Sequence, residues 1–221
     1  MNLSRSELAR MIDHTLLKPE AIPAQIRNLC TEALSHHFAT VCINPSYVSL
    51  AAAQLAHSGV GVCAVVGFPL GANHPEVKRA EAHRALLDGA SELDMVMAIG
   101  RFKAGDLDYV REDIAAVVQA APGRLVKVIL ETALLEPQEI ALGCRIAREA
   151  GASFVKTSTS FGPGGATIEA VALMRRVVGT EMGVKASGGI RDAATARALI
   201  QAGATRLGTS ASLALLSIWE E

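Results

Sequence analysis

Three lysines occupy unusual positions, because each lies inside a short apolar run of the kind that forms β-strands. They are Lys127, Lys156 and Lys185. Lysine is depleted in strands, so such a side chain either enters the protein interior or lies at a strand end with its ammonium group in water. Three of them in successive predicted strands favour the interior. An amine in the protein interior can act as a nucleophile, which makes these lysines candidates for catalysis.

A lysine becomes a carbonyl nucleophile when it loses its proton. An ordinary lysine, with a pKa near 10.4, is neutral in only about one molecule in 2,500 at pH 7. A neighbouring ammonium and removal from water lower such a pKa by up to ~3–5 units. Lys185 is predicted on the strand beside Lys156, and Asp94 offers a carboxylate for proton transfer. These three residues are the predicted catalytic group of a Schiff-base site.

A weak internal repeat links two members of this group. Residues 88–94, 150–156 and 202–208 each contain a glycine typical of a helix C-terminus, followed by the start of an apolar strand. The fifth position after that glycine is Asp94, Lys156 and Gly208 in turn. By our count these positions fall on strands four, six and eight. Side chains from alternate strands of a barrel share one layer, so we expect them at one height.

Two loops after the last two predicted strands favour phosphate binding. Gly188 and Gly189 follow strand seven, while Gly208 and Ser210 close strand eight. Backbone N–H groups in loops of this kind bind phosphate at the carboxyl end of a barrel. Ordinary turns with serine and threonine caps are the alternative.

The elements that must position these residues alternate along the whole chain. We predict strands at residues 11–16, 40–43, 61–68, 92–98, 126–131, 153–158, 183–186 and 205–208. We predict helices at residues 24–37, 46–57, 75–88, 108–120, 136–149, 167–178 and 191–201, with a short one from residue 210. Most strand runs are continuously apolar, as in parallel strands covered on both faces.

About eight such βα units without a break in composition indicate an α/β fold, a single-domain (β/α)8 TIM barrel over residues 1–221. Residues 1–10 are predicted to be a short N-terminal extension. A doubly wound open sheet is the alternative, but the chain contains neither the dinucleotide nor the P-loop glycine motif.

The composition of the chain excludes several classes of binding partner. The 221 residues are 50% hydrophobic and only 4% aromatic, and the net charge is −1, which argues against nucleic-acid binding and against an anionic membrane surface. No apolar run is long enough to span a membrane, and the first ten residues lack the apolar core of a secretory signal. The four cysteines are widely spaced, so we expect free thiols in a reducing cytoplasm, and no zinc site.

The roles of the other polar residues are less clearly indicated by the sequence. Asp13 lies in an apolar run and is expected either at the barrel mouth or in a structural hydrogen bond. Glu131 is four residues beyond Lys127 on the same predicted strand, so the two side chains are expected to face one side and to pair. The six histidines have no metal-ligand spacing.

Seven motifs together resemble the deoxyribose-phosphate aldolase family, and they occur in order between about residues 12 and 216. They are IDHTLLKP at 12–19, VCINPSYV at 41–48, GFPLG at 67–71, ELDMV at 92–96, KVILET at 127–132, FVKTST at 154–159 and VKASGGIR at 184–191. The resemblance implies a (β/α)8 class I aldolase that interconverts 2-deoxy-D-ribose 5-phosphate with acetaldehyde and D-glyceraldehyde 3-phosphate.

The resemblance also implies roles for individual residues. Lys156 forms the Schiff base, and Asp94 and Lys185 act in proton transfer. Phosphate binding falls to Gly188, Gly189, Gly208 and Ser210. We further expect the substrate pocket to include Asp13, Cys42, Lys127 and Thr157. No metal and no cofactor is expected. The partner is a small phosphosugar, and the protein is expected to be a cytoplasmic homo-oligomer, either dimer or tetramer.

The chain departs from the family pattern at four positions. Ser160 and Ser212 stand where glycine is usual, and Ala98 and Arg101 also differ. Some members have a tyrosine in a C-terminal tail that assists proton transfer, whereas the only tyrosines here are at positions 47 and 109. Two other functions stay open: a phosphosugar-binding barrel without catalysis, and a lysine-dependent aldolase with another substrate.

Overall fold

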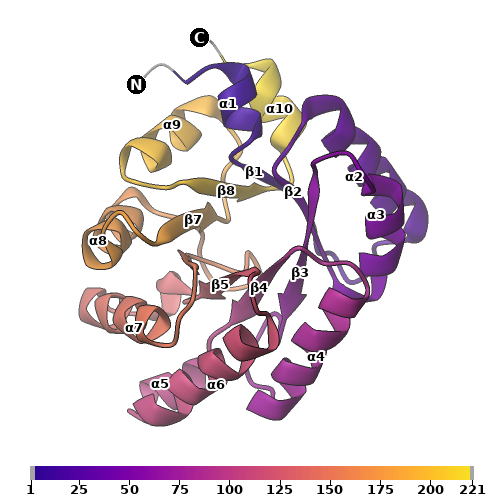
Figure 1. The fold of residues 1–221 in the computed structure, drawn as a ribbon. Helices are drawn as coiled ribbons and strands as arrows, with labels where there is room; N and C mark the ends of the chain where they lie inside the picture. Colours follow the sequence, from indigo (N-terminus) through magenta and orange to yellow (C-terminus); the bar gives the residue numbers. More distant parts are fainter. Residues whose placement is uncertain (1–2, 220–221) are drawn as a thin grey trace.

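Eight parallel strands close into a barrel in the computed structural model, which describes residues 3–219. Figure 1 shows the strands at the centre with the helices around them. The strands are β1 (Ile12–Leu16), β2 (Thr40–Ile43), β3 (Gly61–Val66), β4 (Glu92–Val96), β5 (Leu125–Ile129), β6 (Phe154–Lys156), β7 (Gly183–Ser187) and β8 (Arg206–Thr209). Each strand pairs with its neighbours in sequence, and β8 pairs with β1. The predicted (β/α)8 barrel is confirmed.

Helices follow the strands and cover the outside of the barrel. They are α1 (Arg5–Ala9), α2 (Pro23–His36), α3 (Val48–Leu55), α4 (Pro75–Leu87), α5 (Ile99–Lys103), α6 (Leu107–Ala120), α7 (Pro137–Glu149), α8 (Ile168–Val178), α9 (Ala193–Gln201) and α10 (Ser212–Ser217). Two short 3-10 helices, η1 (Pro45–Tyr47) and η2 (Thr132–Leu134), lie after β2 and β5. None of the helices of residues 3–219 is both long and apolar enough to cross a membrane.

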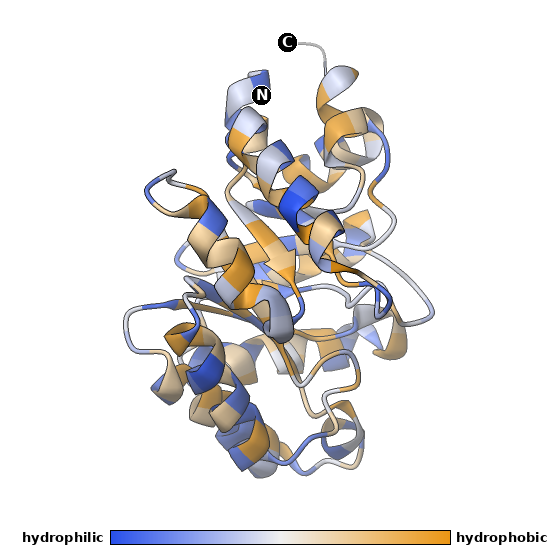
Figure 2. Cartoon of the chain, turned by 90° about the vertical axis from the view of Figure 1, so that its right-hand side faces the viewer, coloured by the Kyte–Doolittle hydropathy of each residue, from blue (hydrophilic) through white to orange (hydrophobic). Residues whose placement is uncertain are grey.

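Local sequence explains where the main helices begin. Pro23, Pro75 and Pro137 each lie in the first turn, where a residue without an N–H group loses no helical hydrogen bond. The side chain of Thr167 accepts a hydrogen bond from the Ala170 N–H and caps α8. Most helices then bury an apolar face against the strands, and Figure 2 shows hydrophobic and hydrophilic residues mixed along them. The buried side of α4 also contains Lys78, which pairs with the buried Asp113 of α6.

Two helices were not predicted. α1 and α5 are five residues each, too short for a helical period to be read from the sequence. Residues Arg5–Ala9 belong to the segment predicted as an extension, yet Leu8 is fully buried in the core. The Trp219 indole donates a hydrogen bond to the Leu3 carbonyl, so the two ends of the described chain lie together, as Figure 1 shows.

The apolar core lies mainly between the strands and the helices. A second, small cluster lies toward the mouth of the barrel and consists of Leu17, Cys42, Cys63 and Val65, with Phe68 packed against it. Its two cysteines also contact a layer of charged side chains, which is unusual for a barrel interior that branched apolar side chains ordinarily fill. This charged layer is where the predicted catalytic residues lie.

Candidate active site

Asp94 is the centre of the charged layer. Its Oδ2 atom accepts hydrogen bonds from Lys156 Nζ at 2.8 Å and from Lys185 Nζ at 2.6 Å. Its Oδ1 atom accepts from Lys127 Nζ at 2.8 Å. β4, β6, β7 and β5 supply these four side chains. The predicted group of Asp94, Lys156 and Lys185 is therefore in direct contact, with Lys127 as a fourth member.

The ionisation of this group is set by competition between burial and charge. Burial opposes the charged form of Asp94, but the ammonium groups of Lys127, Lys156 and Lys185 outweigh it and hold the carboxyl pKa well below its usual range. Burial also disfavours a charged Lys185, yet Asp13 and Asp94 raise its pKa. These carboxylates thus favour the cationic form of Lys185 beside the Lys156 amine.

A second layer of charges lies beneath the first. Lys185 forms an ion pair with Asp13, and Arg206 Nη1 donates to Asp13 Oδ1 at 2.6 Å. Arg206 also contacts Glu92, whose Oε2 atom lies 2.6 Å from Lys127 Nζ. Glu92 and Arg206 are two residues before Asp94 and Gly208 on their strands, so their side chains face the same interior.

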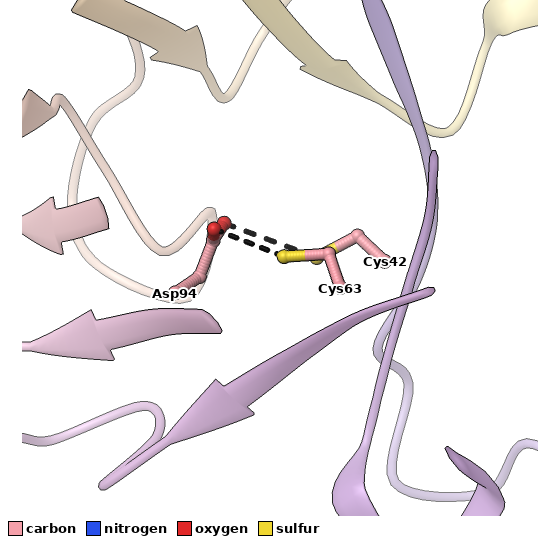
Figure 3. Close-up of side chains that lie close together, drawn as sticks. All are labelled: Cys42, Cys63 and Asp94. Carbon is pink, nitrogen blue, oxygen red and sulfur yellow. Dashed lines mark hydrogen bonds between the residues drawn. The ribbon is translucent and has the colours of Figure 1, made fainter. Parts of the chain in front are cut away.

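Two thiols also converge on Asp94 (Figure 3). Cys63 Sγ donates to Oδ1 at 3.0 Å, and Cys42 Sγ lies 3.9 Å from Oδ2. The three ligand atoms are within 4.8 Å of one another, as metal ligands are. However, both Asp94 oxygens already accept from lysines, and a metal cation would have to displace those ammonium groups. The arrangement therefore favours an ion-pair cluster over a metal centre.

A cavity opens above the charged layer at the carboxyl end of the strands. Its lining includes Lys156, Ser187, Gly208 and Ser210, together with Lys18 from the loop after β1. Lys156 is 3% exposed, whereas Lys127 and Lys185 are fully buried. A molecule that enters the cavity therefore meets the Lys156 amine first.

A second cavity adjoins the first and contains the predicted phosphate loops. It has a volume of about 350 Å³, and Ser160 and Gly208 line both cavities. Residues lining the second cavity also include Gly188, Gly189, Ser210 and Arg191. All four predicted phosphate residues thus meet in one place, beside a guanidinium group that was not predicted. α9 itself is capped by Asp192, which accepts from the Thr195 N–H.

Gly208 has a steric reason to be glycine. A Cβ atom at this position would lie 3.0 Å from Lys185 Cε and 3.1 Å from Ser187 Cβ. A side chain would therefore crowd Lys185 and Ser187, which would have to shift by a few tenths of an ångström to make room for it. The repeat in the sequence correctly places Gly208 on the eighth strand, in register beside Ser187 and Asp13.

The four further residues expected in the substrate pocket lie deeper in the barrel than expected. Asp13, Cys42, Lys127 and Thr157 are fully buried, and none of them lines the two cavities described above. Asp13 and Lys127 join the charge cluster instead, and Cys42 lies beside Asp94. Thr157 Oγ1 donates to the Ser187 carbonyl and accepts from the Ser187 N–H, so it connects β6 to β7.

The predicted pairing of Glu131 with Lys127 is wrong. β5 ends at Ile129, and Glu131 has a φ of 57°, so the alternation of a strand no longer applies to it. Its carboxylate instead accepts from the Thr159 N–H and hydroxyl groups. It therefore holds the loop after β6 in place.

The four departures from the family pattern have separate consequences. Ser160, with a φ of 70°, occupies a conformation that favours glycine, at the rim of both cavities. The Ser212 hydroxyl is buried against His14 Nδ1 at 2.8 Å. Ala98 and Arg101 line a separate surface hollow beside the loop after β3, away from the phosphate loops.

Comparison with known proteins assigns the family. A model of the DeoC/LacD family aldolases matches residues 8–221. The chain belongs to this aldolase family. Curated relatives named deoxyribose-phosphate aldolase include a protein of Bdellovibrio bacteriovorus, 58% identical over 95% of this chain and 96% of its own length. Another, from Enterococcus faecalis, is 56% identical over 96% of both chains.

Solved structures of family members have the same fold. A putative deoxyribose-phosphate aldolase from Coccidioides immitis superposes with a TM-score of 0.95 at 44% identity, covering 98% of this chain and 87% of that one. The deoxyribose phosphate aldolase from Aeropyrum pernix, described as tetrameric, gives a TM-score of 0.91 at 37% identity over 97% and 91% of the two chains. The resemblance seen in the seven motifs is confirmed.

Proposed function

We propose that this aldolase cleaves 2-deoxy-D-ribose 5-phosphate reversibly into acetaldehyde and D-glyceraldehyde 3-phosphate, through a Schiff base on Lys156. The observation that carries the proposal is the place of Lys156 Nζ, which is bonded to Asp94 and borders a cavity that adjoins the glycine loops. This geometry supports a substrate whose aldehyde lies at the lysine and whose phosphate lies at the loops.

The first half of the reaction builds the electron sink. The neutral Lys156 amine adds to C1 of the open-chain sugar, and loss of water from the carbinolamine gives an iminium ion. Asp94 is already bonded to Nζ and takes part in the proton transfers at that atom. Lys185, kept cationic by Asp13 and Asp94, disfavours a second positive charge at Lys156 before the attack.

The second half breaks the carbon–carbon bond. Loss of the proton from the 3-hydroxyl group forms the new aldehyde, the C2–C3 bond breaks, and its electron pair moves into the iminium ion to give an enamine. D-glyceraldehyde 3-phosphate leaves. Protonation of the enamine at C2 and addition of water then release acetaldehyde and restore Lys156.

The loops after β7 and β8 hold the phosphate. Gly188 and Gly189 have φ values of 88° and 80°, which let the backbone face the cavity without a side chain in the way. Ser210 adds a hydroxyl group, and Arg191 adds a positive charge. The phosphate fixes the sugar with its C1 end toward Lys156.

Chemical trapping tests the proposal. The protein is incubated with acetaldehyde and borohydride, and the modified lysine is located by mass spectrometry. We expect a two-carbon adduct on Lys156, and none on Lys156→Ala, which should fold normally and lose essentially all turnover. Lys103→Ala, which removes an exposed lysine paired with Glu139, is the matched control and should keep the adduct. Absence of an adduct from the parent protein would favour a binding barrel without catalysis.

The same measurements address the substrate. An adduct on Lys156 without cleavage of 2-deoxy-D-ribose 5-phosphate would indicate an aldolase with another substrate.

We also propose that the protein is a cytoplasmic homo-oligomer, dimer or tetramer. The tetrameric relative from Aeropyrum pernix supports an oligomer. Size-exclusion chromatography with light scattering measures it directly.

A further inference from the structure

The charged groups inside the barrel form one connected cluster of seven side chains. Ion pairs join all of them, from Lys156 at the cavity to Arg206 and Glu92 beneath. Four of the seven are cations when protonated and three are carboxylates. The cations are Lys127, Lys156, Lys185 and Arg206, and the carboxylates are Asp13, Glu92 and Asp94.

The count leaves one positive charge in excess when every lysine is protonated. An unbalanced charge in a low-dielectric interior is costly, and a buried group commonly loses or gains a proton instead. Neither nearby thiol supplies the missing anion. Burial raises the pKa of the Cys63 thiol well above the ordinary value. The contact with Cys63 lowers the pKa of Cys42, but Cys42 Sγ donates to Asp94 Oδ2 and therefore carries its proton in this arrangement. The cluster is therefore electrically balanced when one lysine is neutral.

The ion pairs indicate which lysine that is. Lys127 has carboxylate contacts to Asp94 at 2.8 Å and Glu92 at 2.6 Å, and Lys185 pairs with both Asp13 and Asp94. Lys156 contacts Asp94 alone, through an oxygen that it shares with Lys185. It has the fewest carboxylate partners, and it borders the cavity, where it can exchange its proton.

We propose that Glu92 and Arg206 are positioning residues of the reaction, because their charges fix the proton count of the whole cluster and so keep the Lys156 amine neutral. This inference rests on the proposed function. Neither residue lines the cavity above Lys156, and neither contacts Lys156 directly among the ion pairs of residues 3–219. They act through Asp13 and Lys127.

Other charged or titratable groups surround Lys156 and are unchanged by substitutions at the two proposed positions. They come from β1, β2, β3, β4, β5 and β7, and from the loops at the mouth: Asp13, Cys42, Cys63, Asp94, Lys127, Lys185, Lys18 and Glu131. Asp13 and Lys127 form ion pairs with the two substituted residues and transmit the change. The other groups form no ion pair with Glu92 or Arg206 within residues 3–219, so their fields are common to the parent protein and to every variant.

Opposite charges predict opposite shifts of the pH profile. Arg206→Gln removes one cation, so a protonated Lys156 is then balanced, and the acid limb of kcat/KM moves to higher pH. Glu92→Gln removes one anion, so a neutral Lys156 is favoured further, and the limb moves to lower pH. At an effective dielectric constant near 20, one charge two ion pairs away gives a shift of about one pH unit.

Two further variants separate charge from structure. Arg206→Lys keeps the cation and should return the limb toward the parent position. The double variant Arg206→Gln/Glu92→Gln removes one charge of each sign, so its limb should lie close to that of the parent. It also leaves no isolated charge at the base of the cluster, which protects folding if a single variant is unstable.

The experiment records kcat/KM against pH together with borohydride trapping of acetaldehyde on Lys156. Opposite shifts in the two single variants, restored in the double variant, support the inference. Shifts of the same sign, or profiles lowered equally at every pH, overturn it and leave a structural role. If the parent protein forms the Lys156 adduct and cleaves 2-deoxy-D-ribose 5-phosphate, the proposed function stands even where the pH profiles overturn this inference. Without an adduct, the proposed function itself fails.

Discussion

Ser160 combines a strained backbone with a place at the phosphate site. Its φ of 70° lies in the left-handed region, which is costly for a residue with a Cβ atom and not for glycine. Its side chain borders both cavities. A single serine therefore has two separable effects, one on stability and one on binding.

Ser160→Gly should raise the free energy of unfolding by up to about 1 kcal/mol, because glycine adopts this backbone without strain. Denaturant unfolding measures the change. Ser35→Gly, in the exposed part of α2, is the control and should lower stability by roughly 0.5–1 kcal/mol. A loss of stability in both variants would show that the Ser160 side chain contributes more than its strain costs.

Residue types alone identified the catalytic candidates, since lysine and aspartate are rare in apolar strands. The same reasoning could have found Glu92 and Arg206, which precede Asp94 and Gly208 by two positions. Both stand at the starts of their strands, where a charged residue usually faces water. Only the closed barrel shows that these two side chains turn inward and meet.

Among the secondary-structure elements, the positions of the strands are predicted well, but the residues at which the strands end are not. Continuous apolar runs locate all eight strands, but β3, β4, β5 and β6 end two residues earlier than predicted. Of the loops that begin at those ends, the one after β6 lines the cavity above Lys156, through Thr159, Ser160 and Phe161. A polar or apolar pattern cannot distinguish a strand end from a buried loop, as Glu131 illustrates.

The two phosphate loops predict a selective effect on phosphorylated substrate. Ser210→Asp places a carboxylate among the donors that face the phosphate, so repulsion should lower kcat/KM for 2-deoxy-D-ribose 5-phosphate at least ~10-fold. Unphosphorylated 2-deoxyribose should be affected far less. Ser210→Asn, of similar size and without the charge, is the control. An equal loss for the two sugars in Ser210→Asp would place the phosphate elsewhere.

At the scale of the whole molecule, His14 joins the first and last units of the barrel. It lies on β1, where its Nδ1 atom is 2.8 Å from the Ser212 hydroxyl of α10 and its Nε2 atom is 2.7 Å from Glu32 of α2. The β1–β8 pairing closes the barrel at the same seam. The serine that departs from the family pattern therefore completes a buried polar bridge.

Ser212→Ala should destabilise the protein by about 1–3 kcal/mol, because it leaves a buried ring nitrogen of His14 without its partner. Thermal or denaturant unfolding measures this loss. Ser217→Ala in the same helix removes an exposed hydroxyl bonded within one turn, and should change stability by less than about 0.5 kcal/mol. Similar losses in the two variants would indicate that the His14 contact contributes nothing specific.

The same bridge makes stability depend on pH. Burial lowers the pKa of His14, although the hydrogen bond to Glu32 opposes the shift. Below the unfolded value of about 6.5, the unfolded chain therefore takes up a proton that the folded chain resists, and the free energy of unfolding falls as the pH falls.

This loss can reach about 1.4 kcal/mol per pH unit and stops once the pH is below the folded pKa. His14→Gln should flatten the dependence between pH 6.5 and that point, whereas His83→Gln on the exterior of α4 should leave it unchanged. Unfolding in urea at closely spaced pH values measures both. A dependence that persists unaltered in His14→Gln would show that His14 is not its source. The buried carboxylates Asp13 and Asp94, whose pKa values are lowered, contribute only at lower pH, as the pH approaches their unfolded value of about 3.9.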